Sequence, residues 1–117
     1  MVGEFILLCF HARTNAHVLH LETRSYAAHK ALNEFYDEIV DLADSFAEAY
    51  IGTHGMIKFP SVPYEPHDDL LEMLDDADDA IETCRSAVNK ADTHLLNILD
   101  EMIALVASTR YKLQYLK

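Results

Sequence analysis

The stretch Ser25–Ile51, SYAAHKALNEFYDEIVDLADSFAEAYI, decides the fold of this chain. Ser25 can cap the first turn of a helix, and Gly52, directly after the stretch, is the residue expected just beyond a helix C-terminus. Between them, apolar residues recur every three or four positions, which predicts one amphipathic helix with a buried face. These apolar residues are Ala28, Leu32, Phe35, Ile39, Leu42, Phe46 and Tyr50.

Three further helices are expected around this one. Apolar residues repeat with helical spacing from about Glu4 to Leu21, from Leu70 to Val88, and from Asp92 or Thr93 to Leu116. The stretch Thr53–His67 contains all three prolines and predicts a long ordered connection. The pattern favours an all-α fold, a ferritin-like four-helix bundle with a long crossover between helices 2 and 3. We expect a single domain over residues 1–117.

The composition restricts the class of protein. A chain of 117 residues suits one small domain. Its net charge of −11, from 20 acidic and 9 basic residues, opposes nucleic-acid binding, because a phosphate backbone needs clustered Lys and Arg. The apolar run Phe5–Phe10 is too short for a membrane span and lacks the basic flank of a signal peptide. We therefore expect a soluble cytoplasmic protein with no nucleic-acid and no membrane partner.

Four residues of the first half have the side chains and the spacing of a metal site. Asp44 and Glu48 lie four residues apart, so a helix presents both carboxylates on one face. His17 and His29 lie about equally far from Thr23, where a helix hairpin would bring their imidazoles side by side. His29 and Asp44 share one helix and lie about 22 Å apart along it, whereas a metal ligand lies about 2 Å from its ion. The two halves can meet only between two copies, so the spacing predicts a homo-oligomer with two such sites at each twofold interface.

Several residues leave two interpretations open. Asp44 and Glu48, taken alone, also suit a solvated helix face. His20 is either an additional ligand or a surface histidine, and we favour the surface position. Cys9 and Cys84 lie in apolar helical patterns and predict reduced core residues. No spacing predicts a partner for the histidines His11, His54, His67 and His94. The acidic residues of the third helix form either a solvated face or the lining of an internal cavity that gathers cations; they are Asp68, Asp69, Glu72, Asp75, Asp76, Asp78, Asp79 and Glu82.

The same residues resemble the ferroxidase signature of the Dps family of small ferritins. The residues that carry the resemblance are His17, His29, Asp44, Ala47 and Glu48, with Ser25, Tyr26 and Tyr36 around the second histidine. The resemblance implies a shell of twelve four-helix subunits with iron bound at twofold interfaces. It also implies an enzyme, a ferroxidase, that oxidises ferrous iron with peroxide or oxygen and stores the product. Carboxylates mixed with imidazoles are a ligand set compatible with iron.

The chain departs from that family at three points. Asn33 stands where the family has an aspartate and offers only a neutral carbonyl oxygen. Asp37, one turn further, is a substitute, so Asn33, Asp37 and His20 are candidates for additional metal ligands or for residues that support the ligands. Val18 replaces the usual tryptophan, and the lysine-rich tail that lets some members bind DNA is absent.

Two functions of different classes follow from the sequence. The first is a Dps-like ferroxidase and iron-storage protein. The second is a non-catalytic four-helix-bundle structural or interaction protein that has lost the metal site and binds a partner through its acidic surface. Metal content and mass in solution distinguish the two.

Overall fold

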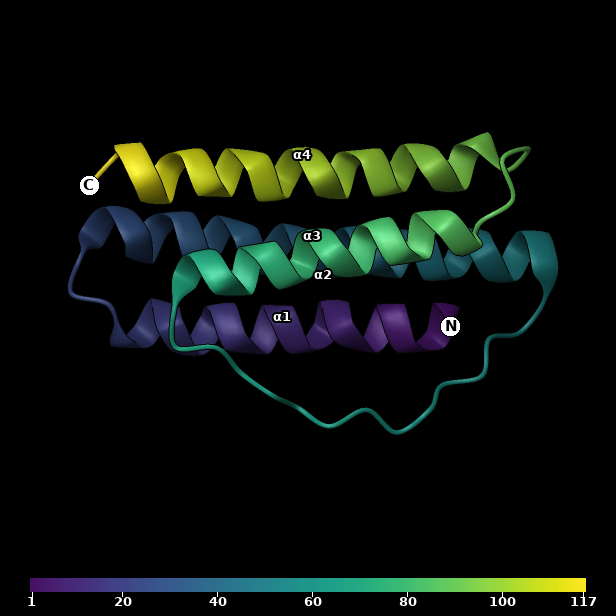
Figure 1. The fold of residues 1–117 in the computed structure, drawn as a ribbon, viewed down its shortest axis with the longest axis horizontal. Helices are drawn as coiled ribbons and strands as arrows, with labels where there is room; N and C mark the ends of the chain where they lie inside the picture. Colours follow the sequence, from purple (N-terminus) through teal and green to yellow (C-terminus); the bar gives the residue numbers. More distant parts are fainter.

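The computed structural model describes residues 1–117 and contains four helices and no strands. Helix α1 spans Val2–Glu22, α2 spans Tyr26–His54, α3 spans Leu70–Ala87 and α4 spans Thr93–Tyr115. The four helices lie side by side (Figure 1). With 29 residues, α2 runs through most of the 44 Å length of the molecule. The prediction of an all-α protein with four helices is confirmed.

The connections between the helices differ in length. Short turns join α1 to α2 and α3 to α4, whereas residues 55–69 form a long connection, here called the strap. The strap runs back along the outside of the bundle, so that α3 begins at the end where α2 begins (Figure 1). It packs closely on α1, because a Cβ atom at Gly3 would overlap the Lys58 carbonyl oxygen. Glycine at position 3 thus lets the strap approach the helix backbone.

Two helices begin at side chains that cap them. Ser25 caps α2, as predicted, by accepting a hydrogen bond from the Ala28 amide at 3.2 Å. Asp69 caps α3, since its carboxylate accepts hydrogen bonds from two backbone amides of the first turn. Both interactions satisfy amides that have no partner within the helix.

The predicted end of α2 at Gly52 is wrong. The helix continues for almost another turn to His54, and Gly55 follows it with a φ angle of 96°. This left-handed conformation favours glycine, which has no Cβ atom to clash with the backbone. Two glycines three residues apart gave the sequence two possible ends, and the second is used.

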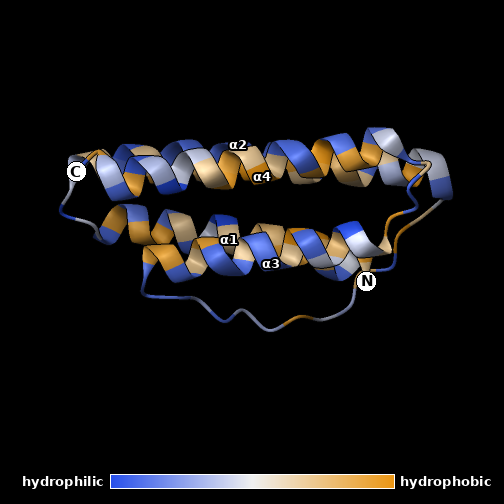
Figure 2. Ribbon diagram, turned by 45° about the horizontal axis from the view of Figure 1, so that its top comes forward, coloured by the Kyte–Doolittle hydropathy of each residue, from blue (hydrophilic) through white to orange (hydrophobic).

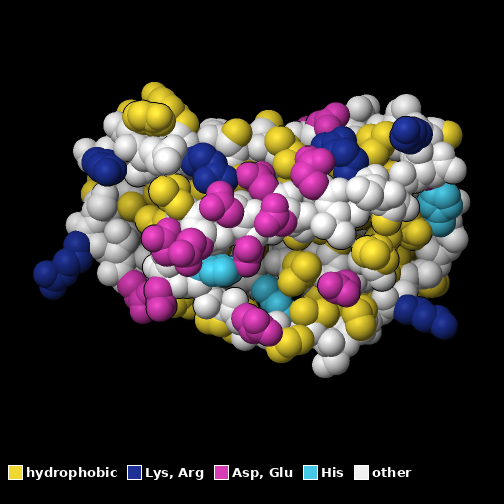
Figure 3. Space-filling view, viewed as in Figure 1, with side chains coloured by type: hydrophobic (Ala, Val, Ile, Leu, Met, Phe, Trp, Pro, Cys, Tyr) yellow, Lys and Arg dark blue, Asp and Glu magenta, His cyan; other side chains and the backbone are white.

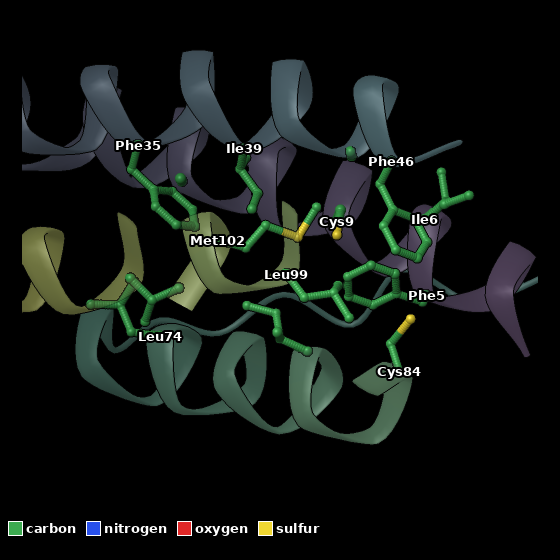
Figure 4. Close-up of a cluster of buried hydrophobic side chains, with 14 of the residues drawn as sticks. Phe5, Ile6, Cys9, Phe35, Ile39, Phe46, Leu74, Cys84, Leu99 and Met102 are labelled. Atoms are coloured by element: carbon green, nitrogen blue, oxygen red, sulfur yellow. The ribbon is translucent and has the colours of Figure 1, made fainter. Parts of the chain in front are cut away.

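The apolar stripes of the four helices meet in one core. Each of α1 and α4 packs against both α2 and α3, and polar residues alternate with apolar ones along the helices (Figure 2). Figure 4 shows side chains of all four helices pointing into this core. Phe5 and Phe46 meet there edge to face, with ring centroids 5.6 Å apart. None of the four helices combines the length and the apolar character needed to cross a bilayer.

Candidate functional site

A cluster of ring side chains lies between α1 and α2, near the turn that joins them. The rings of His20 and His29 stack with centroids 3.6 Å apart. His17 stacks on Tyr36 at 4.3 Å, and His20 contacts both of these rings edge-on. The helix hairpin therefore gathers histidines from both helices, with His20 in contact with His17 on one side and His29 on the other.

Two hydrogen bonds fix the stacked pair. Nδ1 of His20 donates to the His29 carbonyl oxygen at 2.6 Å, and Nδ1 of His29 donates to the His20 carbonyl oxygen at 2.9 Å. A carbonyl oxygen only accepts, so both Nδ1 atoms carry hydrogen, and in neutral rings both Nε2 atoms keep a free lone pair. The His20 carbonyl lies in the last turn of α1, where carbonyls lack helical partners. His29 therefore also caps α1.

The preference for a surface position of His20 is wrong. Only 7% of its surface is exposed, because its ring fills the space between the two helices. The sequence offered a weak signal, since a residue one turn after His17 faces the same neighbour. The bonds to His29 depend on how α2 packs after the turn, which no local pattern predicts.

The remaining predicted residues around this cluster lie on α2. The Tyr36 hydroxyl donates to Asn33 Oδ1 at 2.8 Å, and the Asn33 amide donates to the Asp37 carboxylate at 3.0 Å. Asn33 and Asp37 are thus linked to the histidine cluster through Tyr36. Their role as additional metal ligands or supporting residues stays a prediction.

The two carboxylates of the predicted metal site lie elsewhere on the molecule. Asp44 and Glu48 are exposed on the second half of α2, whereas His29 lies in its first turn. No three His, Cys, Asp or Glu side chains within one chain are grouped to hold a metal ion. A site formed by His17 and His29 of one copy with Asp44 and Glu48 of another stays a prediction.

A second polar group connects the end of α2 to the start of α4. Nε2 of His54 lies 2.7 Å from the Asp92 carboxylate, and Nε2 of His94 lies 2.9 Å from the Thr53 hydroxyl. The Thr53 hydroxyl donates to the Ala49 carbonyl, so it accepts from His94. A nucleophile activated by a general base needs the opposite direction of donation. These partners lie 38 and 41 residues apart, which is why no spacing predicted them.

Two thiols are the remaining nucleophilic groups. Cys9 and Cys84 are free and buried in the core (Figure 4), so the prediction that they are core residues is confirmed. Burial raises the pKa of the Cys9 thiol far above its ordinary value and that of Cys84 to about 12. The thiolate is the reactive form. These two side chains therefore serve packing rather than chemistry.

Eight carboxylates at and after the start of α3 form what we call the α3 acidic face: Asp68, Asp69, Glu72, Asp75, Asp76, Asp78, Asp79 and Glu82. Figure 3 shows carboxylates gathered on the surface over this region, with histidine side chains beside them. Seven of the eight residues are exposed and Asp78 is half-buried. In the single chain they form a solvated face, the first of the two interpretations.

The side of α3 that faces α4 has its charge neutralised. Arg110 of α4 contacts Asp75 at 2.9 Å and Asp78 at 3.0 Å. Arg85 lies 3.3 Å from Glu82 on the same helix and also contacts α4. The pKa of Arg85 lies above its ordinary value, chiefly because its guanidinium group hydrogen-bonds to Asp100. The guanidinium groups thus hold α3 and α4 together.

The other side of α3 borders the strap. His67 of the strap contacts the Asp76 carboxylate through Nε2 and lies 4.0 Å from that of Glu72 through Nδ1. Asp79, one turn beyond Asp76, forms no salt bridge. This side therefore carries carboxylates without a Lys or Arg partner.

A groove of about 500 Å³ lies between α1, the strap and α3. Asn15 of α1, only 4% exposed, anchors the strap beside it. Its amide donates to the His67 carbonyl at 3.0 Å, and its carbonyl accepts from the His67 amide at 2.9 Å. Further along the strap, the rings of Tyr64 and His11 meet edge to face at 5.5 Å. No local sequence pattern marks Asn15, because its partner lies 52 residues away.

Comparison with known proteins gives a family and one relative. The profile of a family described as "Family of unknown function (DUF5856)" matches residues 20–113. A stretch of 60 residues is 42% identical to an "Uncharacterized 14.6 kDa protein in mobD-ri intergenic region" of Enterobacteria phage T4. This stretch covers 51% of the chain and 47% of the phage protein, so the match spans about half of that relative. No solved structure matches the chain.

These matches overturn the resemblance to the Dps family. The matching profile covers the region of His29, Asp44 and Glu48, and no ferritin-like or Dps profile matches. The resemblance was carried by a few polar residues at helical spacing. Such residues recur on the exposed faces of unrelated amphipathic helices, particularly in a chain with 20 acidic residues and seven histidines.

Proposed function

We propose that this chain, which belongs to the DUF5856 family of unknown function, is a non-catalytic four-helix protein that binds a basic protein partner through its acidic surface. The observation that carries the proposal is the α3 acidic face. Its strap-facing side holds carboxylates that no Lys or Arg of the chain neutralises. A cationic partner would relieve the repulsion among them.

The groups most suited to chemistry support this proposal by their contacts. His20 and His29 bond to each other's backbone, His54 bonds to Asp92, and both thiols are buried in the core. Each of these contacts stabilises the packing of one helix on another. These packing roles explain the positions of the histidines and thiols without assigning them a catalytic reaction.

A site-specific cross-linking experiment tests the proposal. A photoreactive residue at Glu72 on α3 should form a discrete adduct with a basic protein, whereas the same residue at the exposed Glu101 on α4 should not. The purified partner should bind less tightly as salt rises, because surface charges are screened. It should bind at least about tenfold less tightly to a variant with Asp68→Asn, Glu72→Gln and Asp76→Asn. Equal adducts from both positions, or affinity unchanged in the triple variant, would contradict the proposal.

A metal site between two copies is the second candidate function. It is favoured by the tautomer of His29, whose Nδ1 bond leaves Nε2 free to bind a metal. Asp44 and Glu48 of another copy would complete the site, with iron as the predicted metal at two sites per dimer interface. The assembly would be a homo-oligomer with twofold interfaces. This candidate rests on the donor atoms and carries no assumption of a ferritin relative.

Titration with ferrous iron under anaerobic conditions separates the two candidates. If the second is correct, iron binds in proportion to subunits, and Asp44→Ala with Glu48→Ala abolishes binding without changing the mass in solution. If the first is correct, wild type and variant give the same weak heats. The homo-oligomer would scatter light as a particle larger than the 13.3 kDa subunit.

The ferritin-like connectivity of the fold is also a proposal. It is supported by the strap, which returns along the bundle so that α2 and α3 run in the same direction (Figure 1). The statement concerns the order of the helices alone and implies neither descent nor iron chemistry.

A further inference from the structure

The groove beside the strap has an apolar floor. Leu8 and Ala12 of α1 face Met73, Ala77 and Ala80 of α3 across it. The alanines leave room that larger side chains would fill, which keeps the groove open between two packed helices. A groove of about 500 Å³ is large enough for one or two side chains of a bound peptide.

The charged residues at the rim of the groove are all acidic. Glu65 comes from the strap, and Asp76 and Asp79 come from α3; no Lys or Arg lines the groove. Of these three carboxylates, only Asp76 has an ion-pair partner, the imidazole of His67. An apolar floor under an unneutralised acidic rim complements a side chain with a long aliphatic stem and a cationic head.

The groove is held open before any ligand arrives. The two hydrogen bonds between Asn15 and His67 fix the strap to α1 at one end of the groove, and His67 also bonds across to Asp76 on α3. The contact between His11 and Tyr64 supports the strap further along. A rigid groove loses little conformational entropy when it is filled.

We infer that this groove is the docking site for a basic segment of the partner protein, which places a Lys or Arg side chain and an apolar neighbour between α1, the strap and α3. The inference rests on the proposed function and adds the location and the chemistry of the contact. The stem of the basic side chain lies on Ala77 and Ala80, and its head lies between Asp79 and Glu65. The apolar neighbour fills the space over Leu8.

The remainder of the surface offers a natural comparison. A second groove of about 450 Å³ between α2 and α4 is also rich in carboxylates, including Asp41 and Glu101. It contains Lys112, which contacts Glu34 at 2.6 Å. Lys112 neutralises one of its four carboxylates, so each groove keeps three carboxylates without a Lys or Arg partner, and the strap groove differs by its apolar floor. The two grooves provide matched positions for variants.

The experiment uses a synthetic five-residue peptide in which two lysines flank a leucine, with glutamines replacing the lysines in the control peptide. Binding is followed in the amide NMR spectrum of the full chain at about 50 mM salt, where surface charges act over about 14 Å. Wild type should bind the lysine peptide, with shifts confined to α1, the strap and α3. The glutamine peptide should bind at least about fivefold more weakly.

Matched variants locate the contact. The pair Glu65→Gln and Asp79→Asn should weaken binding about fivefold or more, since each carboxylate contributes up to about fivefold. The pair Asp41→Asn and Glu101→Gln makes the same change of net charge in the other groove and should alter affinity less than about twofold. These pairs separate a local contact from general attraction to an acidic protein.

Filling the groove is the steric counterpart. Ala80→Phe should weaken the peptide at least about tenfold by occupying its floor. Ala104→Phe in the second groove should have no effect. The dispersed amide spectrum of each variant reports whether it is folded.

Three results would overturn the inference. Equal losses from both carboxamide pairs would mean diffuse attraction, which leaves the proposed function intact and removes the groove as its site. Spermidine that binds in the same groove as tightly as the peptide would make the occupant a small polyamine rather than a protein segment. No binding of the lysine peptide to the wild-type chain would remove the groove as the site, whereas the proposed function would still be decided by the cross-linking experiment at Glu72.

Discussion

The aspartates on the two sides of α3 have different partners. Toward α4, Asp75 and Asp78 share the guanidinium of Arg110. Toward the strap, Asp76 has only an imidazole partner and Asp79 has none. Arginine stays charged at any physiological pH, so the first side is a permanent link between helices. The second side keeps its negative charge available, which stabilises the fold less and suits binding.

The largest expected effect comes from a substitution that releases the strap from α1. Asn15→Ala removes both hydrogen bonds to the backbone of His67 and leaves its part-buried amide and carbonyl without partners. We expect a loss of about 2–3 kcal/mol in the free energy of unfolding, measured by urea denaturation. Asn97→Ala on the exposed face of α4 is the matched control and should cost less than about 0.5 kcal/mol. Equal small losses would show that the strap is not anchored at Asn15.

The next largest effect comes from a substitution that removes the ion pairs between α3 and α4. Arg110→Met keeps the aliphatic stem but removes the guanidinium that holds Asp75 and Asp78. Because both carboxylates are more than a third exposed, screening limits the loss to about 1 kcal/mol. The loss should shrink as salt rises to about 1 M. A loss that is the same at low and high salt would assign the effect to packing of the stem instead.

The helices were predictable because their signals are local. The apolar period of Ser25–Ile51 and the cap at Ser25 depend only on residues within a few turns, and both predictions are confirmed. The end at Gly55 instead of Gly52 depends on which glycine can adopt positive φ where the chain turns into the strap. That choice is made by the tertiary path of the strap.

The candidate sites were only partly predictable, because they are made by pairs distant in sequence. The positions around Thr23 predicted His29 beside His17, whereas His29 stacks on the buried His20, which in turn contacts His17. Asn15 and His67 meet only because the strap crosses α1. A sequence pattern shows which residues share a face of one helix, whereas the groove depends on which faces meet.

A pH titration extends the comparison to another ion pair of α4. Lys112 donates a hydrogen bond to Glu34. This hydrogen bond is the main reason why the pKa of the Glu34 carboxyl lies below its usual range, and the positive charge of Lys112 is the second. Because the pKa of this carboxyl is lower in the folded chain than the value of about 4.3 in the unfolded chain, the interaction adds stability above that pH. The added stability is lost as the pH falls through the pKa of the folded chain. Lys112→Met should therefore raise the pKa of Glu34 and flatten the stability profile below about pH 5. The carboxyl carbon resonance of Glu34, followed by NMR, checks this shift.

The smallest effect sharpens the comparison most, because it predicts opposite signs for neighbouring residues. Asp78→Asn removes half of the Arg110 pair and should lower the free energy of unfolding by about 0.5 kcal/mol. Asp79→Asn makes the same chemical change one residue later but removes only repulsion from nearby carboxylates, so it should raise that free energy by about 0.3 kcal/mol. Thermal unfolding at low salt resolves the two, and both differences should fade as salt rises. If Asp79→Asn destabilises the chain as much as Asp78→Asn does, its carboxylate already has a structural partner, and it is not free to receive a cation from outside.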